Sequence, residues 1–260
     1  MKNGRTRKFL LAILGFLIIL LAWQSLIWFF DLPAFLVPAP AKVLKRGLEL
    51  GVNWWPHLWA SMYSTVLGFL LAMGAGFSLG TLIVHSRIVS AIITPPLLLL
   101  QIVPKMALAP IILVWVGIGL ASRTTVVVLV TFFPIVISTI AGLQSIEPEA
   151  IDLARSLQMG RWNILKKIRF PNALPHIFSG LRVASTLAVI GTVISEFVAS
   201  QSGLGYIILS AGFVLDTALQ FAALALITIF GAAFYGLVVL AERLAMPWYV
   251  SDVKLVEVMT

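Results

Sequence analysis

Six apolar blocks, each about as long as a membrane-crossing helix, limit what this chain can fold into. A helix rises about 1.5 Å per residue, so roughly 20 apolar residues cross the ~30 Å hydrocarbon core of a bilayer. The blocks cover residues 9–30, 61–84, 88–116, 124–143, 177–199 and 221–241. The chain is 60% hydrophobic and only 11% charged, which argues against a soluble enzyme or a nucleic-acid-binding module.

We therefore predict an all-α, polytopic membrane protein with about six transmembrane helices. The net charge of +8 fits this topology, because basic residues collect on the cytoplasmic side of membrane proteins. The distribution of the basic residues along the chain predicts that the N- and C-termini are cytoplasmic. The predicted parts are a basic tail at 1–8, a transmembrane domain at 9–241 with an inner segment at 144–175, and a cytoplasmic tail at 242–260.

Two blocks carry patterns that predict their packing. In the second block a small residue recurs at every fourth position: Ser64, Gly68, Ala72, Gly76 and Gly80. Small side chains allow helix backbones to approach closely in lipid, so this stripe predicts tight helix packing. The third block contains Pro95, Pro96, Pro104 and Pro110, which predict a broken or sharply bent helix.

The segments between the blocks differ in length and polarity. Residues 117–123 and 200–220 are predicted to be outer segments, and Val43–Leu50 is a short amphipathic stretch. The long polar interruption is 144–175, where Pro148 suits a helix start. An apolar stripe follows it: Ala150, Ile151, Ala154 and Leu157.

Gly160 is expected to break that helix, and a second short helix is expected to end at Phe170-Pro171. The result is a helix-turn-helix that is apolar on one side and basic on the other. Such a segment suits docking to a partner, and it equally suits an amphipathic helix resting on anionic lipid.

The stretch from Glu149 to Glu196 resembles the cytoplasmic "EAA" signature of ABC importer permeases. Asp152, Leu153 and Ala154 fall on E-A-A, and Ile168, Phe170 and Pro171 fall on I-x-L-P. Gln158 stands where the signature has glycine, and Gly160 is expected to supply the turn instead. Residues 35–40, 103–110 and 115–119 are similar to the nitrate/sulfonate/taurine branch, so the resemblance covers roughly residues 35–250.

This resemblance implies a type I importer in a bacterial cytoplasmic membrane. The implied partners are two ABC ATPase subunits, a second copy of this permease, an external solute-binding protein and membrane lipid, with no nucleic acid. The implied ATPase-coupling residues are Glu149, Ala150, Asp152, Ala154, Leu157, Gln158, Gly160, Ile168 and Pro171. Arg161, Lys166, Lys167 and Arg169 are expected to orient the docked partner.

The chain has no phosphate-binding loop of the form G-x-x-x-x-G-K-[ST], so it is not expected to hydrolyse ATP. No cofactor is expected in this chain, because ATP and Mg would sit on the partner. We also expect no metal site, since the chain has no cysteine and its three histidines are scattered. No catalytic constellation is recognisable.

Five polar residues are candidates for the translocation path: Gln101, Lys105, Thr192, Ser195 and Glu196. Ionisable groups at membrane depth face a protein interior or a watery path. Lys105 could contact an anionic solute, snorkel, or pair with another helix. A structural or gating salt bridge is favoured for Glu196. Each of the other three could instead bond a neighbouring backbone.

The sequence thus predicts the permease subunit of an ATP-driven importer for a small polar or anionic solute. Sulfonates, nitrate, taurine, aromatic acids and heterocyclic precursors are all compatible with it. The alternative is an ion-coupled secondary transporter, for which inverted repeats and intramembrane carboxylates would be typical. A membrane-embedded enzyme would need acids or histidines gathered at one depth, whereas the acids here are dispersed.

Overall fold

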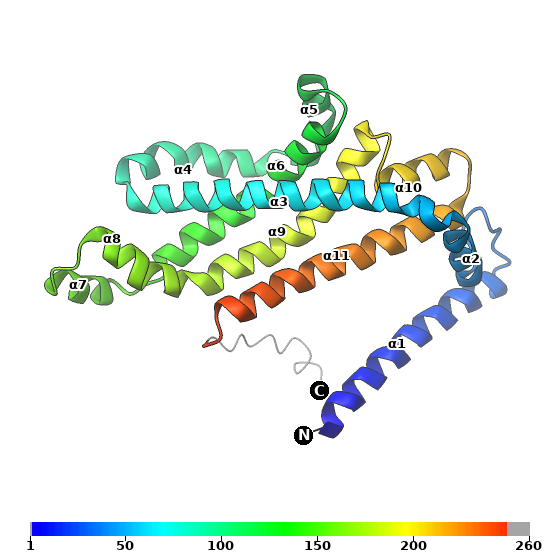
Figure 1. The fold of residues 1–260 in the computed structure, drawn as a ribbon, viewed down its shortest axis with the longest axis horizontal. Coiled ribbons are helices and arrows are strands. Elements are labelled where there is room, and N and C mark those ends of the chain that lie inside the picture. Colours follow the sequence, from blue (N-terminus) through cyan, green and yellow to red (C-terminus); the bar gives the residue numbers. More distant parts are fainter. Residues whose placement is uncertain (1, 249–260) are drawn as a thin grey trace. The chain divides into compact units, whose positions relative to one another are not determined.

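The computed structural model describes residues 2–248, and throughout that range the regular elements are helices (Figure 1). The α-helices run over α1 (Lys2–Phe29), α2 (Pro40–Leu50), α3 (Trp54–His85), α4 (Arg87–Ile102), α5 (Ala109–Val116), α6 (Leu120–Gln144), α7 (Pro148–Ser156), α8 (Arg161–Ile164), α9 (Phe170–Ala199), α10 (Leu204–Phe213) and α11 (Thr217–Ala245). Two short 3₁₀ helices are η1 (Gly51–Asn53) and η2 (Lys105–Leu108), and one π-helical turn is η3 (Leu165–Arg169). Residue 1 and residues 249–260, which hold most of the predicted C-terminal tail, lie outside the described residues.

The helices account for each predicted apolar block. Within residues 2–248, four spans are long and apolar enough to cross a membrane: α3, α6, the helix from Arg161 to Val198, and α11. The pair α4 and η2–α5 makes a fifth when it is counted as one bent span. Ile13–Phe29 of α1 is a shorter apolar helix. The all-α, polytopic prediction is therefore confirmed.

The chain divides into two compact units. Unit 1 contains the residues up to Ala60 together with Gln201–Thr228, and unit 2 contains Ser61–Ser200 together with the described residues from Ile229 onward.

In unit 2, the small-residue stripe of α3 lies directly against α6. A Cβ placed on Gly68 would lie 2.6 Å from the Val127 side chain, and one on Gly80 would lie 2.8 Å from Thr139. Both glycines are buried, as are Ser64, Ala72 and Gly76. The prediction of close packing along this stripe is confirmed. Because lipid is as apolar as the side chains, the association gains from van der Waals contact at short range.

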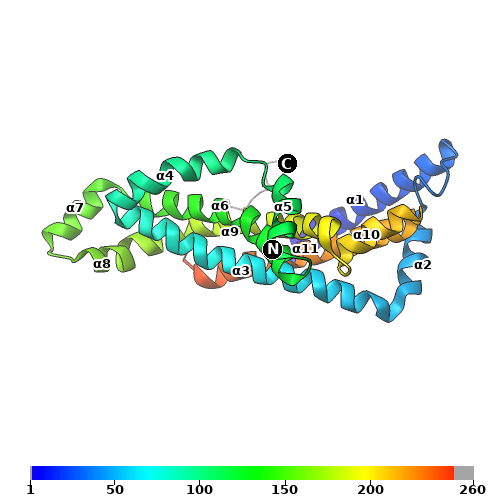
Figure 2. The same ribbon diagram turned by 90° about the horizontal axis from the view of Figure 1, so that it is seen from above.

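α6 also packs closely on α9. A Cβ on Gly180 of α9 would lie 2.4 Å from the Ser138 side chain, and one on Gly142 of α6 would lie 2.8 Å from the Ala173 carbonyl. Both views place α3, α6 and α9 side by side in unit 2 (Figures 1 and 2). α6 is thus held by close backbone approach to both α3 and α9.

The third block bends as predicted, by 87° between α4 and the η2–α5 segment. The break falls at Val103-Pro104, whereas Pro95 and Pro96 lie inside α4. Proline is tolerated within membrane helices when the freed carbonyls are satisfied locally. Pro110 sits in the first turn of α5, where its missing N–H is not needed.

Unit 1 is held together by polar contacts around the start of α11. Arg46 Nε of α2 donates to Asp216 Oδ2 at 2.8 Å, and Asp216 Oδ1 accepts the Leu219 N–H at the N-terminus of α11. Asp216, and after it Glu49, raises the pKa of Arg46 above its ordinary value. His57 Nδ1 accepts the Gly203 N–H at 3.2 Å.

Several helices extend past the predicted apolar blocks. α1 already begins at Lys2, within the predicted basic tail, and α11 runs to Ala245, beyond the predicted end of the last block at 241. The predicted outer loop at 117–123 is shorter, because α6 already begins at Leu120 and includes a buried Arg123. The predicted outer segment at 200–220 contains a helix, α10. It was not predicted because the glycines of this segment suggested a loop, whereas they lie just before α10 or in its first and last turns.

The α3–α6 contact predicts that replacing two glycines of α3 with alanine has different effects on the stability of the protein. Gly68→Ala adds a methyl group 2.6 Å from Val127, whereas Gly74→Ala meets nothing within 4 Å. We expect the first to destabilise the protein by about 1–3 kcal/mol through overpacking. The second should be neutral or stabilising, because alanine favours helix by about 1 kcal/mol. Thermal unfolding in detergent measures both, and equal melting temperatures would contradict the packing described.

Candidate functional site

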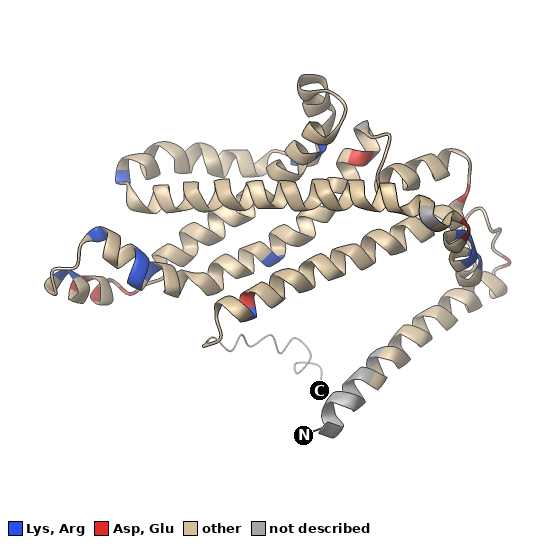
Figure 3. Ribbon diagram, in the orientation of Figure 1, with Lys and Arg blue, Asp and Glu red and all other residues tan. Residues whose placement is uncertain are grey.

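One end of unit 2 carries the polar segment that the sequence singles out. We call residues 145–169, which connect α6 to α9, the elbow. The elbow contains α7, α8 and η3, and in both views it lies at the far end of the α3, α6 and α9 helices (Figures 1 and 2). Figure 3 shows the basic residues of unit 2 gathered mainly at this end.

The turn between α7 and α8 rests on Gln158. The Gln158 N–H donates to the Arg155 carbonyl at 2.8 Å, and the Met159 N–H donates to the Ala154 carbonyl at 3.1 Å. This pair of bonds is a Schellman motif, which places its central residue in the left-handed conformation. Gln158 has a left-handed φ of +56°, whereas the backbone of Gly160 is extended, with φ −63° and ψ 152°. The expectation that Gly160 supplies the turn is therefore wrong.

The second half of the elbow is continuous with the following membrane helix. The predicted stop at Phe170-Pro171 is wrong, since Arg161–Val198 forms one helical span of 38 residues. The π-turn η3 lies just before Pro171, where a proline has no N–H for a regular helical ladder. A displacement of the elbow would therefore be carried directly into the span.

The predicted coupling residues separate into three groups. Glu149, Asp152, Leu157, Gln158 and Gly160 are exposed, and Ala154 is buried, with 3% of its surface accessible. Ala150, Ile168 and Pro171 line a cavity.

The exposed part of the elbow also carries large apolar side chains. Leu153 is 64% exposed, Leu157 70% and Trp162 68%. We call these three residues the apolar triad. The predicted stripe of α7 included Leu157 but not Leu153, because it followed one face of that helix. Arg155, which forms an exposed ion pair with Asp152 at 3.0 Å, lies between these two leucines in sequence.

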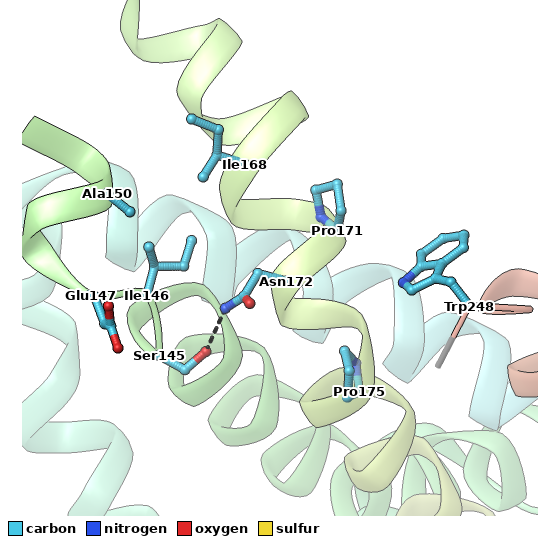
Figure 4. Close-up of a pocket in the computed structure, with 9 residues that line it drawn as sticks. All are labelled: Ser145, Ile146, Glu147, Ala150, Ile168, Pro171, Asn172, Pro175 and Trp248. Atoms are coloured by element: carbon cyan, nitrogen blue, oxygen red, sulfur yellow. Dashed lines mark hydrogen bonds between the residues drawn. The ribbon is translucent and has the colours of Figure 1, made fainter. Parts of the chain in front are cut away.

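The cavity measures about 680 Å³ and is lined by the first residues of the elbow and by the start of α9. Figure 4 shows Ser145 and Asn172 joined across it by a hydrogen bond of 3.1 Å, with Ala150 and Ile168 nearby. Trp248 also lines it, from beyond the end of α11. The bond ties the end of α6 to the start of α9 and so sets where the elbow begins.

A second polar site lies inside unit 2, where α3, α6 and α9 meet. Ser61 Oγ donates to Glu196 Oε1 at 2.7 Å, and Arg123 Nη1 lies 3.8 Å from the same oxygen. One turn later on α3 and one turn earlier on α9, the hydroxyls of Thr65 and Thr192 are 2.7 Å apart. We call these five residues the buried polar cluster.

The cluster contains two of the candidate path residues, and a third is close in sequence. Thr192, Ser195 and Glu196 are 0%, 3% and 1% exposed, so they are enclosed by the helices of unit 2. Ser195 Oγ donates to the Thr192 carbonyl. The partner Arg123 was missed by the sequence reasoning, which placed it in an outer loop.

Gln101 and Lys105 lie at the α4 break, with contacts of their own. The Lys105 ammonium donates to the Gln101 carbonyl at 2.8 Å and lies 4.7 Å from the centre of the Phe133 ring. The lysine thus caps a carbonyl in the last turn of α4 and makes a cation–π contact with α6. A further ion pair missed by sequence joins Arg182 of α9 to Glu242 of α11 at 3.5 Å.

Comparison with known families gives a match across most of the chain. The profile of the family described as "Binding-protein-dependent transport system inner membrane component" matches residues 64–246. The riboflavin transport system permease protein RibX of Chloroflexus aurantiacus is 37% identical over 238 residues, covering 90% of this chain and 88% of that protein.

Two further relatives have lower identity but similar coverage. The taurine transport system permease protein TauC of Escherichia coli is 30% identical, covering 94% of this chain and 91% of the relative. The putative aliphatic sulfonates transport permease protein SsuC of Bacillus subtilis is 30% identical, covering 89% and 84%. A solved inward-facing structure of the MetNI methionine ABC transporter shares the fold, with a TM-score of 0.61 at 20% identity over 78% of this chain and 96% of that chain.

The buried polar cluster predicts a large cost for neutralising one charge. Glu196→Gln leaves the Arg123 guanidinium, whose side chain is 10% exposed, without its carboxylate, which should destabilise the protein by about 3 kcal/mol or more. The control is Glu149→Gln on the exposed face of α7. Replacing both Arg123 and Glu196 with leucine should recover part of the loss. Unfolding midpoints in detergent measure all three, and an unchanged Glu196→Gln midpoint would show that the pair is not a structural contact.

Proposed function

The chain belongs to the family of inner-membrane components of binding-protein-dependent transport systems, and we propose that its elbow is the surface that receives the ATPase subunit. It is the multi-pass permease subunit of a bacterial ABC importer. It is not itself the ATPase, and it works with an ATPase and a binding protein. The match of the family profile to residues 64–246 carries this assignment.

The docking role is supported by the apolar triad. Leu153, Leu157 and Trp162 are large apolar side chains that are each more than 60% exposed on the elbow. Amphipathic helices seat in a partner's groove by such anchors, and neighbouring charges fix their orientation. Arg155 and Arg161 stand beside the triad and suit that role. Among the predicted coupling residues, Leu157 is therefore a direct contact, whereas Ala154 acts through packing.

The coupling step follows from the continuity of the elbow with α9. ATP and Mg bound on the partner would close the ATPase subunits and move the elbow with them. Because Arg161–Val198 is one helical span, the movement reaches the membrane core without an intervening hinge. Two copies of this chain would form the path between them, with both termini and the elbow on the cytoplasmic side.

The buried polar cluster suits a structural lock within each copy better than a solute contact. Glu196 is satisfied by Ser61 and faces Arg123, and the three side chains come from three helices. Such a contact would keep α3, α6 and α9 moving as one body. A solute contact by Thr192, Ser195 or Glu196 would require these helices to separate.

The solute is proposed to be small and polar or anionic. The relatives' names mention riboflavin, taurine and aliphatic sulfonates. The identity is 37% with the riboflavin permease and 30% with the other two. This difference favours a heterocyclic solute as the first compound to test.

If the elbow binds the ATPase subunit, a charge placed within the apolar triad should weaken the binding of that subunit. Leu157→Asp places a carboxylate where an apolar anchor is proposed, and Asn163→Asp adds the same charge at an exposed position of the same elbow. We expect the first variant to lose most of the co-purifying ATPase subunit and the second to retain it. Equal retention by both variants, with equal membrane levels, would rule out the triad as an anchor.

The solute assignment is tested through the cognate binding protein. We expect that protein to co-purify with, or bind, a heterocyclic solute such as riboflavin in preference to taurine or an alkyl sulfonate. Proteoliposomes holding the permease and its ATPase should then accumulate the same solute only with ATP and the binding protein. Preferential binding and uptake of a sulfonate would overturn the heterocycle proposal and leave the importer assignment standing.

A further inference from the structure

A second cavity of unit 2 is lined by an unusual concentration of positive charge. It measures about 770 Å³ and lies between the α3–α4 turn and the elbow. Arg87 lines it from the turn, and Arg155, Arg161 and Arg169 line it from the elbow, with His85 beside them. Its size is within the range of ordinary ligand sites. The lining contains no carboxylate.

The charges around this cavity are poorly compensated. Arg155 pairs with the exposed Asp152, whereas Arg87, Arg161 and Arg169 have no carboxylate within ion-pair distance anywhere in residues 2–248. Like charges that face one cavity repel each other. An anion bound among them would remove this repulsion and gain charge-assisted hydrogen bonds, which guanidinium groups donate well to phosphate.

The backbone adds to the attraction for an anion. Ser86 and Arg87 line the cavity at the start of α4, a helix of 16 residues whose N-cap is Ser86. The positive end of the helix dipole and the unpaired N–H groups of its first turn therefore face the same region as the arginines.

The remaining lining is apolar, which indicates the kind of anion. Ile88 is 73% exposed at the edge of the cavity, and Ile151, Ile164 and Leu165 complete the wall. The cavity also lies where α3 ends and α4 begins, at the boundary of two spans. A phosphate next to apolar groups, where two membrane helices meet, is the chemistry of a phospholipid headgroup and glycerol region.

We infer that this cavity binds the phosphate headgroup of an anionic phospholipid, held by Arg87 of the α3–α4 turn and by Arg161 and Arg169 of the elbow. The lipid bridges two segments that are far apart in sequence and so restrains the elbow against the membrane helices. The inference goes beyond the proposed docking role. The apolar triad does not line the cavity, whereas Arg155 and Arg161, which we propose to orient the docked partner, do.

The test compares two variants that each remove two positive charges from this end of unit 2. Arg87→Gln with Arg161→Gln removes two residues of the cavity, whereas Lys166→Gln with Lys167→Gln removes two exposed elbow residues that do not line it. The proteins are delipidated in neutral detergent and titrated with phosphatidylglycerol, phosphatidylcholine or inorganic phosphate. Bound lipid is read by native mass spectrometry and the gain in melting temperature by thermal unfolding.

We expect phosphatidylglycerol to bind and stabilise the natural protein, and phosphatidylcholine to do neither. The arginine variant should bind phosphatidylglycerol roughly tenfold more weakly or worse, and the lysine variant within about threefold of the natural protein. Replacing both arginines by lysine should retain most of the binding, which separates loss of charge from misfolding.

Three results would overturn the inference. The two charge-removing variants could lose phosphatidylglycerol equally, which would mean a general surface attraction. Inorganic phosphate could stabilise the protein as much as the lipid, which would mean a free anion. The arginine variant could keep its lipid while losing the ATPase subunit, which would assign the cavity to acidic side chains of that partner.

Discussion

The close approach of both α3 and α9 to α6 is the constraint on which unit 2 depends. In lipid, apolar side chains gain nothing by leaving the solvent, so the helices are held by short-range contact and by a few polar bonds. Gly68 and Gly80 bring the α3 backbone onto α6, and Gly142 and Gly180 do the same between α6 and α9. The buried Ser61, Arg123 and Glu196 then join the same three helices by hydrogen bonding and charge.

Because of this packing, the elbow is attached at both ends to helices that are packed against each other. The Ser145–Asn172 bond joins the end of α6 to the start of α9, and α9 is continuous with α8 through the π-turn. A partner that moves the apolar triad would therefore move α6 and α9 together. The basic cavity lies between the same elbow and the α3–α4 turn, so a bound lipid would act on the same mechanical element from the membrane side.

Much of this arrangement can be predicted from the sequence, because apolar length and small-residue spacing are local signals. The spans, the bend in the third block and the α3 stripe all follow from them. Contacts between distant residues give no such signal: Arg123 looks like a loop residue until α6 is seen to begin at Leu120 and to carry it towards Glu196. The position of the turn in the elbow was predicted wrongly for another reason. Hydrogen bonds from Gln158 and Met159 support a left-handed glutamine, so the nearby Gly160 is not needed there.

The most direct test of the central claim, that the elbow meets a separate motor subunit, is a cross-link from the apolar triad. The chain has no cysteine, so Leu157→Cys supplies a single attachment point for a short photoactivatable group. In the assembled complex, the account predicts an adduct between position 157 and the ATPase subunit. Adducts with lipid or with another copy of this chain alone, while the ATPase subunit is present in the complex, would contradict it.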